Sequence, residues 1–455
     1  MGGPGVRFWR AALRVERLRF SLLTALGLAG LAALVLAAPA LAAPSFSWSS
    51  TYGGAFGGDD RFEAMVVDAA GNIYAVGSVA RVAKYGPDVL LVKVSPAGTR
   101  LWARRFDGPR GRDDYALDVV QDSWGDLYLT GHVSGHGGDA LVAKYAPDGT
   151  LRWWRAYDRG YDFADTGVAI GVDAQGNVYV AATCALSVNK TRLVVIKYDR
   201  SGRKKWTRAI GAATSSTRPR DVGVNATGDV VVCGTTRASS SRGTSSLIAM
   251  LDTGGRLRWQ TAYNGEPAGP TQSLKVRWQG NGIWVLGSTH DDGAAFSRAH
   301  IARFSRLGRL TRAYGTPKDG PGYSFRDLVV GSTGAYVAGH FDAASGTDSL
   351  VLKVTPAVTY DWAAGLNVGT WESFDAIAMD AWGNVWAVGQ AGGPLTVLGL
   401  NPAGASLGSI SRSAPLVTND TVAAAVCQDG GLYVAGSTRV GSGTSDGLVA
   451  RVALR

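Results

Sequence analysis

The 455 residues are 46% hydrophobic and 18% charged, a composition that suits a globular chain with enough apolar material for a core. Three cysteines, Cys184, Cys233 and Cys427, are too few for a disulfide scaffold. A bond between Cys184 and Cys233, which fall in neighbouring repeats, stays open, and we favour a pair of buried thiols. The formal net charge of +10 is scattered rather than gathered into a block of like charges. The charge pattern therefore argues against a nucleic-acid partner.

The first forty-two residues differ in kind from the rest. Five arginines, from Arg7 to Arg19, precede an uncharged run over residues 20–42 that ends in Pro39-Ala40-Leu41-Ala42. A basic start, an apolar run and a small-x-small end predict a secretory signal peptide over residues 1–42, with cleavage after Ala42. Cleavage would lower the net charge from +10 to +6, because five arginines and one glutamate leave.

The same uncharged run is also long enough to span a bilayer without being cleaved. The arginines before it would then stay in the cytoplasm. Both alternatives place the remainder of the chain outside the cell, so we predict a secreted or cell-surface protein. After cleavage, no membrane span is expected.

From residue 43 onward, one ten-residue phrase recurs eight times. Its first copy is Asp68-Ala-Ala-Gly71-Asn-Ile-Tyr74-Ala-Val-Gly77. A valine- and alanine-rich run precedes each copy and a β-rich run follows its glycine, which supplies the positive φ of a tight turn, so each copy predicts a β-hairpin. The aspartates are expected to serve the turns rather than catalysis. The third position after the glycine is aromatic in most copies: Tyr74, Tyr128, Tyr179, Tyr336, Trp386 and Tyr433, with Trp284 one position early and Val231 in the fourth repeat.

A second phrase follows each first one, beginning with Lys93 and ending in Gly98-Thr-Arg-Leu-Trp102. It predicts another hairpin, so each repeat holds four strands. Because the strands are apolar on both faces, they must be packed on both sides, as in the blades of a propeller. The closing tryptophan recurs as Trp153, Trp206, Trp259 and Trp362, whereas Arg312 and Gly408 stand there in repeats five and seven.

The two ends of the repeat region complement each other. The eighth repeat stops after its third strand, and residues 45–52 form an isolated fourth strand in which Trp48 takes the place of Trp102. We therefore predict an all-β, eight-bladed β-propeller over residues 43–455, with four-stranded blades and the N-terminal strand completing the last blade. A closed ring leaves no free sheet edge, and we expect a monomer.

These two phrases resemble the bacterial β-propeller repeat of secreted proteins (SBBP type). The combination D-x-x-G-N-x-Y-x-x-G and K-Y-x-P-x-G-x-x-x-W carries the resemblance over residues 45–455. The G-x-x-x-W strand is also similar to the tryptophan-docking strand of quinoprotein-like propellers. The resemblance implies the fold and export, and it does not imply one activity.

The glycine turns should emerge on one face of the ring and the more varied loops on the other, where a site is expected. Acid pairs such as Asp59-Asp60 lie in these loops and are interpreted as caps of strand ends. His132 and His340 fall four blades apart, too distant to share an ion. We predict no catalytic residue, cofactor or metal site.

Four aromatic residues just before inner strands are the predicted binding patch: Tyr161, Phe163, Phe325 and Trp371. The resulting hypothesis is an extracellular binding or scaffold module for a glycan, a cell-envelope polymer or a protein. The alternative is a hydrolase or lyase with its site at the mouth of the central channel. Since propellers host both, the fold cannot decide between them.

Overall fold

The computed structural model describes the repeat region with short gaps. The described residues are 7–10, 43–54, 58–81, 86–135, 137–160, 163–238, 243–265, 270–290, 297–317, 321–343, 346–367, 371–412, 418–440 and 443–454. The predicted signal peptide lies outside them, apart from a short strand, β1 (Arg7–Arg10), which pairs with the outer strand of the sixth blade. Within the described residues, no helix is long and apolar enough to cross a membrane.

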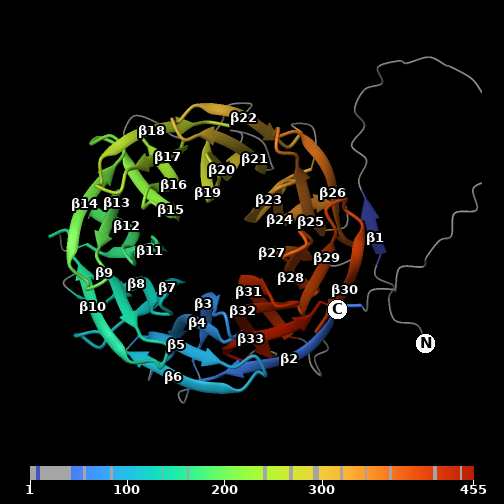
Figure 1. Cartoon of the computed structure of the whole chain (residues 1–455), viewed down its shortest axis with the longest axis horizontal. Helices are drawn as coiled ribbons and strands as arrows, with labels where there is room; N and C mark the ends of the chain where they lie inside the picture. The colour runs from blue at the N-terminus through green and yellow to red at the C-terminus, as the bar shows by residue number, and fades with distance from the viewer. Residues whose placement is uncertain are drawn as a thin grey trace, which may run out of the picture.

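The chain forms a ring of eight antiparallel sheets, each a four-stranded meander running from the centre outward (Figure 1). This confirms the predicted eight-bladed β-propeller. The first four blades are β3 (Arg61–Val67), β4 (Ile73–Val79), β5 (Asp88–Val94) and β6 (Arg100–Phe106); β7 (Tyr115–Gln121), β8 (Leu127–Val133), β9 (Asp139–Tyr145) and β10 (Leu151–Tyr157); β11 (Asp165–Val172), β12 (Val178–Ser187), β13 (Lys190–Tyr198) and β14 (Lys204–Ile210); β15 (Ser216–Val224), β16 (Val230–Arg237), β17 (Ser245–Leu251) and β18 (Leu257–Tyr263).

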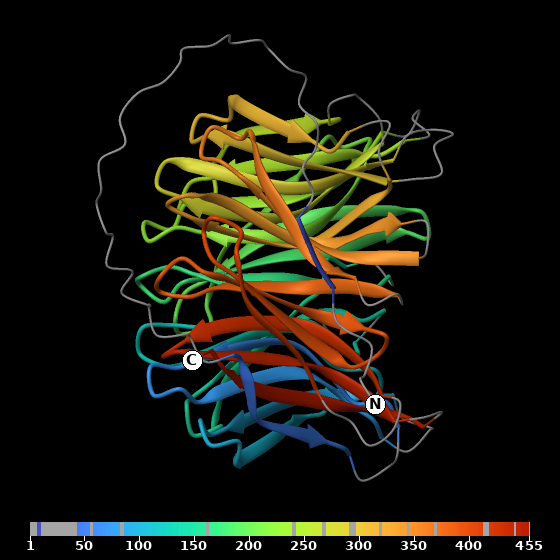
Figure 2. The same ribbon diagram turned by 90° about the vertical axis from the view of Figure 1, so that its right-hand side faces the viewer.

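The other four blades follow the same order, and the last one takes its outer strand from the N-terminus. They are β19 (Thr271–Gln279), β20 (Gly282–His290), β21 (Ser297–Ser305) and β22 (Leu310–Gly315); β23 (Tyr323–Gly331), β24 (Gly334–Ala343), β25 (Gly346–Val354) and β26 (Tyr360–Asn367); β27 (Glu372–Met379), β28 (Val385–Ala391), β29 (Leu395–Leu400) and β30 (Ser406–Ser411); β31 (Thr418–Gln428), β32 (Gly431–Val440), β33 (Ser445–Ala453) and β2 (Ser45–Tyr52). Seen edge-on, the strands run between the two faces of the ring (Figure 2).

The first repeated phrase folds as predicted, because its aspartate holds the turn together. Asp68 Oδ1 accepts hydrogen bonds from the backbone amides of Ala70 and Asn72, and Oδ2 accepts one from the Tyr74 hydroxyl at 3.1 Å. Gly71 has φ +78°, which an L side chain disfavours. Asp122, Asp173 and Asp380 make the same bonds.

The second phrase joins neighbouring blades. Tyr179, Lys197 and Trp206 lie side by side across β12, β13 and β14. Lys197 Nζ and Trp206 Nε1 both donate to the carbonyl of Thr253 in the next blade, at 3.0 and 3.1 Å. The indole covers Gly255, where a Cβ would overlap the ring. The tryptophan of each such row is therefore an inter-blade contact.

The ring closes as predicted. β2 pairs antiparallel with β33, with Trp48 opposite Arg451, and lies along the outer edge of the last blade (Figure 1). Trp48 Nε1 donates to the carbonyl of Pro96 in the first blade at 2.9 Å. The N-terminal strand thus contributes both a sheet edge and an inter-blade contact.

Each inner strand carries a β-bulge at its variable-loop end, a feature that the sequence analysis did not predict. In the first blade the bulge lies between Phe62 and Ala64, opposite Gly77. A Cβ at Gly77 would overlap the backbone carbonyl of Arg61, which explains why the first phrase ends in glycine. The bulge places one extra residue per blade at the inner rim.

The residues that depart from the two repeated phrases occupy the positions that the sequence predicts for them. Trp284 occupies the aromatic row after a shorter turn, and its Nε1 donates to Gln279 Oε1 at 2.9 Å. At the tryptophan position, Arg312 of blade five lies opposite Arg303, and Gly408 of blade seven lies opposite Gly399. Cys184 and Cys233 are buried free thiols.

Deleting residues 43–52 should remove the outer strand of the last blade and expose the edge of β33. We expect aggregation or a large fall in melting temperature, because an unpaired edge strand recruits other chains. Thermal unfolding and light scattering would measure this. Unchanged melting of the shortened protein would contradict the closure.

Trp153→Ala should lower the free energy of unfolding by about 2 kcal/mol, since a half-buried ring and its hydrogen bond to Arg200 are lost. Arg312→Ala, at the equivalent position of blade five, is the matched control and should change stability by less than roughly 0.5 kcal/mol. Denaturant unfolding compares the two. Equal losses would disprove the assigned role of the row.

Candidate functional site

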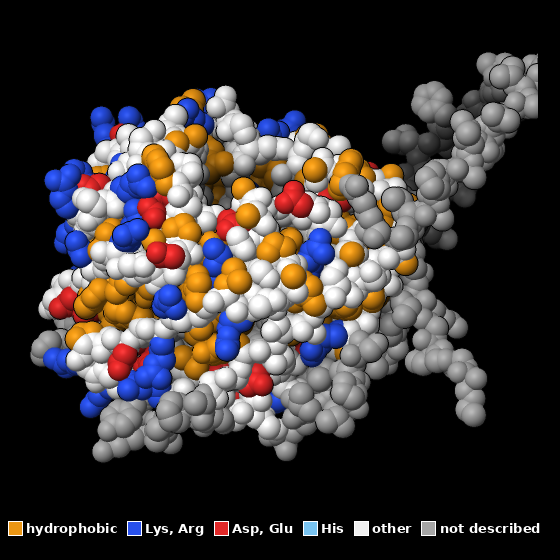
Figure 3. All heavy atoms as spheres, turned by 60° about the horizontal axis from the view of Figure 1, so that its bottom comes forward, with side chains coloured by type: hydrophobic (Ala, Val, Ile, Leu, Met, Phe, Trp, Pro, Cys, Tyr) orange, Lys and Arg blue, Asp and Glu red, His pale blue; other side chains and the backbone are white. Residues whose placement is uncertain are grey.

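The two faces of the ring differ in the connections that they carry. The glycine turns lie on one face, and the loops before the inner strands and between the second and third strands lie on the other. On the side drawn in Figure 3, basic and acidic side chains are interspersed among apolar ones. Any specific site is therefore expected from particular residues rather than from one large charged patch.

The four predicted aromatics do not form one patch. Trp371 is 51% exposed and Phe163 is 36% exposed, but they belong to blades seven and three, on opposite sides of the ring. Tyr161 lies outside the described residues. Phe325 is only 2% exposed and stacks on Tyr323 inside the core, so it presents no binding surface.

The position of Phe325 has a physical explanation. It directly precedes the bulge of its inner strand, as Phe62 and Phe374 do in their blades, and all three side chains are buried. The residue before the bulge is thus a core position of the repeat. Comparison of the three aligned phenylalanines could have revealed this from the sequence.

Around Trp371, the structure brings together four polar side chains from blades six and seven. The Trp371 ring lies 6.2 Å from the ring of His340. His340 Nδ1 is 3.0 Å from Ser373 Oγ, which donates to Asp375 Oδ1 at 3.4 Å. Arg326 Nε lies 3.2 Å from the same oxygen of Asp375. We call these five residues the Trp371 cluster.

The bulges create this cluster. Arg326 and Asp375 are the extra residues of β23 and β27, so they lie at the inner rim rather than in the core. Trp371 immediately precedes β27, and His340 lies in β24. Sequence reasoning missed the four polar residues because it did not predict the bulges.

The environment sets the charges of the cluster. Burial raises the pKa of Asp375 to about 6, although Arg326 and Ser373 oppose the shift. Burial, together with Arg326, lowers the pKa of His340. At neutral pH the cluster therefore presents a neutral imidazole, a carboxylate and a guanidinium beside an exposed indole.

Deeper in the channel, charged residues of the inner strands join neighbouring blades. Arg277 NH1 lies 2.6 Å from Asp221 Oδ2, and Arg277 NH2 lies 3.5 Å from Asp327 Oδ1. Asp221 and Asp327 also accept the amides of Val276 and Ile377 from the next inner strands. These charges are used in holding the ring together.

The loop acids serve as caps, as predicted. Asp60 accepts the backbone amide of Ala80 at 2.6 Å, and Asp114 accepts the equivalent amide of Ser134. Asp165 accepts the amide of Arg159 in the connection from the preceding blade, and Asp420 accepts that of Leu395 in the preceding blade. The carboxylates of Asp88, Asp107 and Asp114 lie close enough to surround an ion. Arg81 pairs with Asp88 and Asp107, and Arg105 also pairs with Asp88, so these two acids belong to an ion-pair network. Asp114 accepts the backbone amide of Gly108 as well as that of Ser134.

No protein-family model matches the sequence, and no curated protein matches it either. Solved structures similar to this chain include Sqt1 from Chaetomium thermophilum, with a TM-score of 0.54 and 10% identity over 90% of this chain and 99% of that one. A protein of unknown function from Dyadobacter fermentans has a TM-score of 0.43 and 12% identity over 91% and 100% of the two chains. Extracellular domains 1–2 of Drosophila Semaphorin 1a have a TM-score of 0.44 and 12% identity over 74% and 85%.

At such identities, the likeness shows the fold alone. The protein is a β-propeller, and its function must be argued from its own residues.

The raised pKa of Asp375 predicts that the ionised carboxylate costs stability. Asp375→Asn should raise the free energy of unfolding at pH 7.5 by about 1–2 kcal/mol. Because the folded-state pKa of about 6 exceeds the unfolded value, the gain should shrink as the pH falls through 6 and vanish near 4. Denaturant unfolding across this range measures it. A gain independent of pH would indicate a packing effect instead.

Proposed function

We propose that this protein is an exported binding propeller that recognises a glycan through the Trp371 cluster. One observation carries the proposal: an indole that is 51% exposed stands beside a carboxylate, a guanidinium, an imidazole and a hydroxyl. The apolar face of an indole packs against the C–H face of a sugar ring, and the polar side chains can bond its hydroxyl groups.

Export rests on the sequence. The basic start, apolar run and small-x-small end of residues 1–42 support secretion, as does the resemblance of the repeats to those of secreted bacterial propellers. An envelope polysaccharide is then the partner class that a secreted binding module would meet. A protein ligand remains an outcome of the test below.

A hydrolase or lyase at the channel mouth is the second candidate. It is favoured by the pKa of Asp375, about 6, which suits a general acid or base. The geometry is against a serine triad, however, because Ser373 lies between His340 and Asp375, whereas a triad needs the histidine in the middle. Binding therefore accounts better for the arrangement.

The test is a screen of the purified protein against glycan arrays and isolated cell envelopes. Trp371→Ala should weaken binding of a positive ligand at least roughly tenfold, as expected for a central aromatic anchor. Trp124→Ala is the matched control, because Trp124 is also 51% exposed but lies in a glycine turn on the opposite face. It should leave binding unchanged.

Three results would count against the proposal: no glycan ligand, equal losses in the two variants, or a ligand that is exclusively protein. Incubation of the ligand with the wild-type protein, followed by product analysis, separates binding from cleavage. Cleavage that is lost in Asp375→Asn would favour the second candidate.

A further inference from the structure

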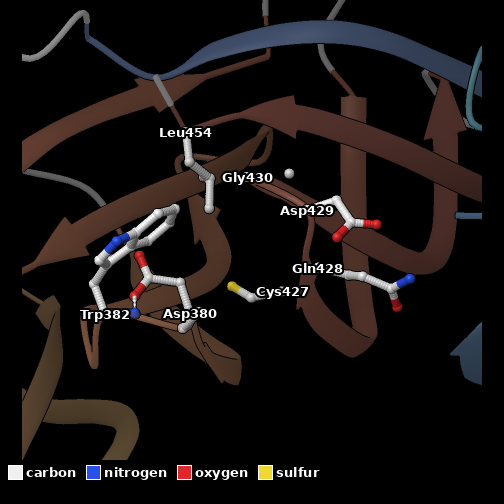
Figure 4. A pocket seen from close by; sticks show the side chains of 9 residues that line it. Asp380, Trp382, Cys427, Gln428, Asp429, Gly430 and Leu454 are labelled. Carbon is white, nitrogen blue, oxygen red and sulfur yellow. Dashed lines mark hydrogen bonds between the residues drawn. The ribbon is translucent and has the colours of Figure 1, made fainter. Parts of the chain in front are cut away.

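A cavity of about 430 Å³ opens between the turns of blades seven and eight, on the face opposite the Trp371 cluster. Asp380 and Trp382 from blade seven line it, with residues 427–431 of blade eight and Leu454 (Figure 4). Trp382 is 58% exposed, whereas Leu454 is buried and Cys427 is half-buried. The cavity thus combines an indole, a carboxylate and an apolar wall.

The equivalent place between blades two and three is filled by an arginine. Trp124 and Asp122 hold the positions of Trp382 and Asp380 in the repeated phrase. The Arg200 guanidinium lies 3.9 Å from the centre of the Trp124 ring. It also lies 3.0 Å from Asp126 Oδ2 and 3.6 Å from Asp122 Oδ2. An arginine therefore fits beside a tryptophan and an aspartate at this position of the repeat.

The residue at the position of Arg200 varies between blades: it is proline in blades one, two, six and seven (Pro96, Pro147, Pro356 and Pro402) and Leu454 in blade eight. Arg200 lies three residues after Lys197 in the turn to the outer strand, and Leu454 lies three residues after Arg451, the equivalent of Lys197. The last blade receives its outer strand from the N-terminus, so no such turn is formed there. A short apolar side chain stands where a guanidinium stands in blade three.

A second junction shares the ion pair but not the indole, because Thr227 stands at the position of Trp124. Arg306, at the position of Arg200 in blade five, pairs with Asp229 of blade four. An arginine that reaches back to an acid of the preceding turn is thus a recurrent solution in this propeller. At the junction of blades seven and eight, Trp382 and Asp380 are present, whereas Asn384 stands at the position of Asp126 and Asp229 and Leu454 at the position of the arginine, so the carboxylates beside the indole are those of Asp380 and Asp429.

We propose that this cavity binds an arginine side chain of a partner protein. Its guanidinium would stack on Trp382 and pair with Asp380, while Leu454 and Cys427 contact its aliphatic stem. Asp380 Oδ2 accepts hydrogen bonds from Asn384 and Trp386, just as Asp122 Oδ2 accepts one from Tyr128 while facing Arg200. Asp429 lines the cavity as a further carboxylate.

The test uses N-acetyl-arginine amide as the probe and follows the tryptophan indole signals of the purified protein by NMR. We expect one saturable site, lost in Trp382→Ala and blocked in Leu454→Arg, which places a guanidinium where Arg200 stands. N-acetyl-lysine amide should bind roughly fivefold more weakly, because its ammonium cannot stack as a plane. Arg200→Ala, the matched variant, should open the Trp124 site and give two bound probes instead of one.

Three outcomes would overturn the proposal. The first is binding in Arg200→Ala but not in wild type, and the second is binding that Trp382→Ala does not alter. The third is binding that requires deletion of Arg455, which would mean that the chain's own terminus takes the site. Trp371→Ala should leave probe binding unchanged, so the result is independent of the proposed glycan site.

Discussion

The contact on which the ring depends is the donation of hydrogen bonds from one blade to a turn carbonyl of the next. Lys353 Nζ and Trp362 Nε1 both donate to the Pro402 carbonyl, and the indole covers Gly404 of the same turn. The contact requires glycine in the turn, an aromatic row in the sheet and a tryptophan on the outer strand. Where a repeat has these three features, they produce both the blade and its attachment to the next blade.

Blades that lack part of this row use other means. In blade seven, Gly399 and Gly408 replace the cation and the tryptophan, and the Trp386 ring fills the space over Gly399. In blade five, Arg303 takes the place of the lysine and donates to the Pro356 carbonyl at 3.0 Å. Blades five and seven thus join their neighbours without the complete row.

The sequence predicted what repeats and could not predict what differs. The turn aspartates, the tryptophan row and the closure by Trp48 were all readable, since each is a local signal present in several copies. The site was not, because Arg326, His340 and Asp375 meet only through a bulge and a contact between blades. Phe325 is a different case, since its burial could have been inferred by aligning it with Phe62 and Phe374 of the other repeats.

The two faces were expected to differ, since repeated turns share one chemistry and only the varied loops can present a unique surface. Closure changes this. A ring made from one chain must join its ends somewhere, and at that junction the turn present in every other blade is absent. At that junction Leu454, rather than a residue of a turn, lines the cavity beside Trp382. On the two proposals made above, the ring would bind a glycan on one face and an arginine of a partner protein on the other.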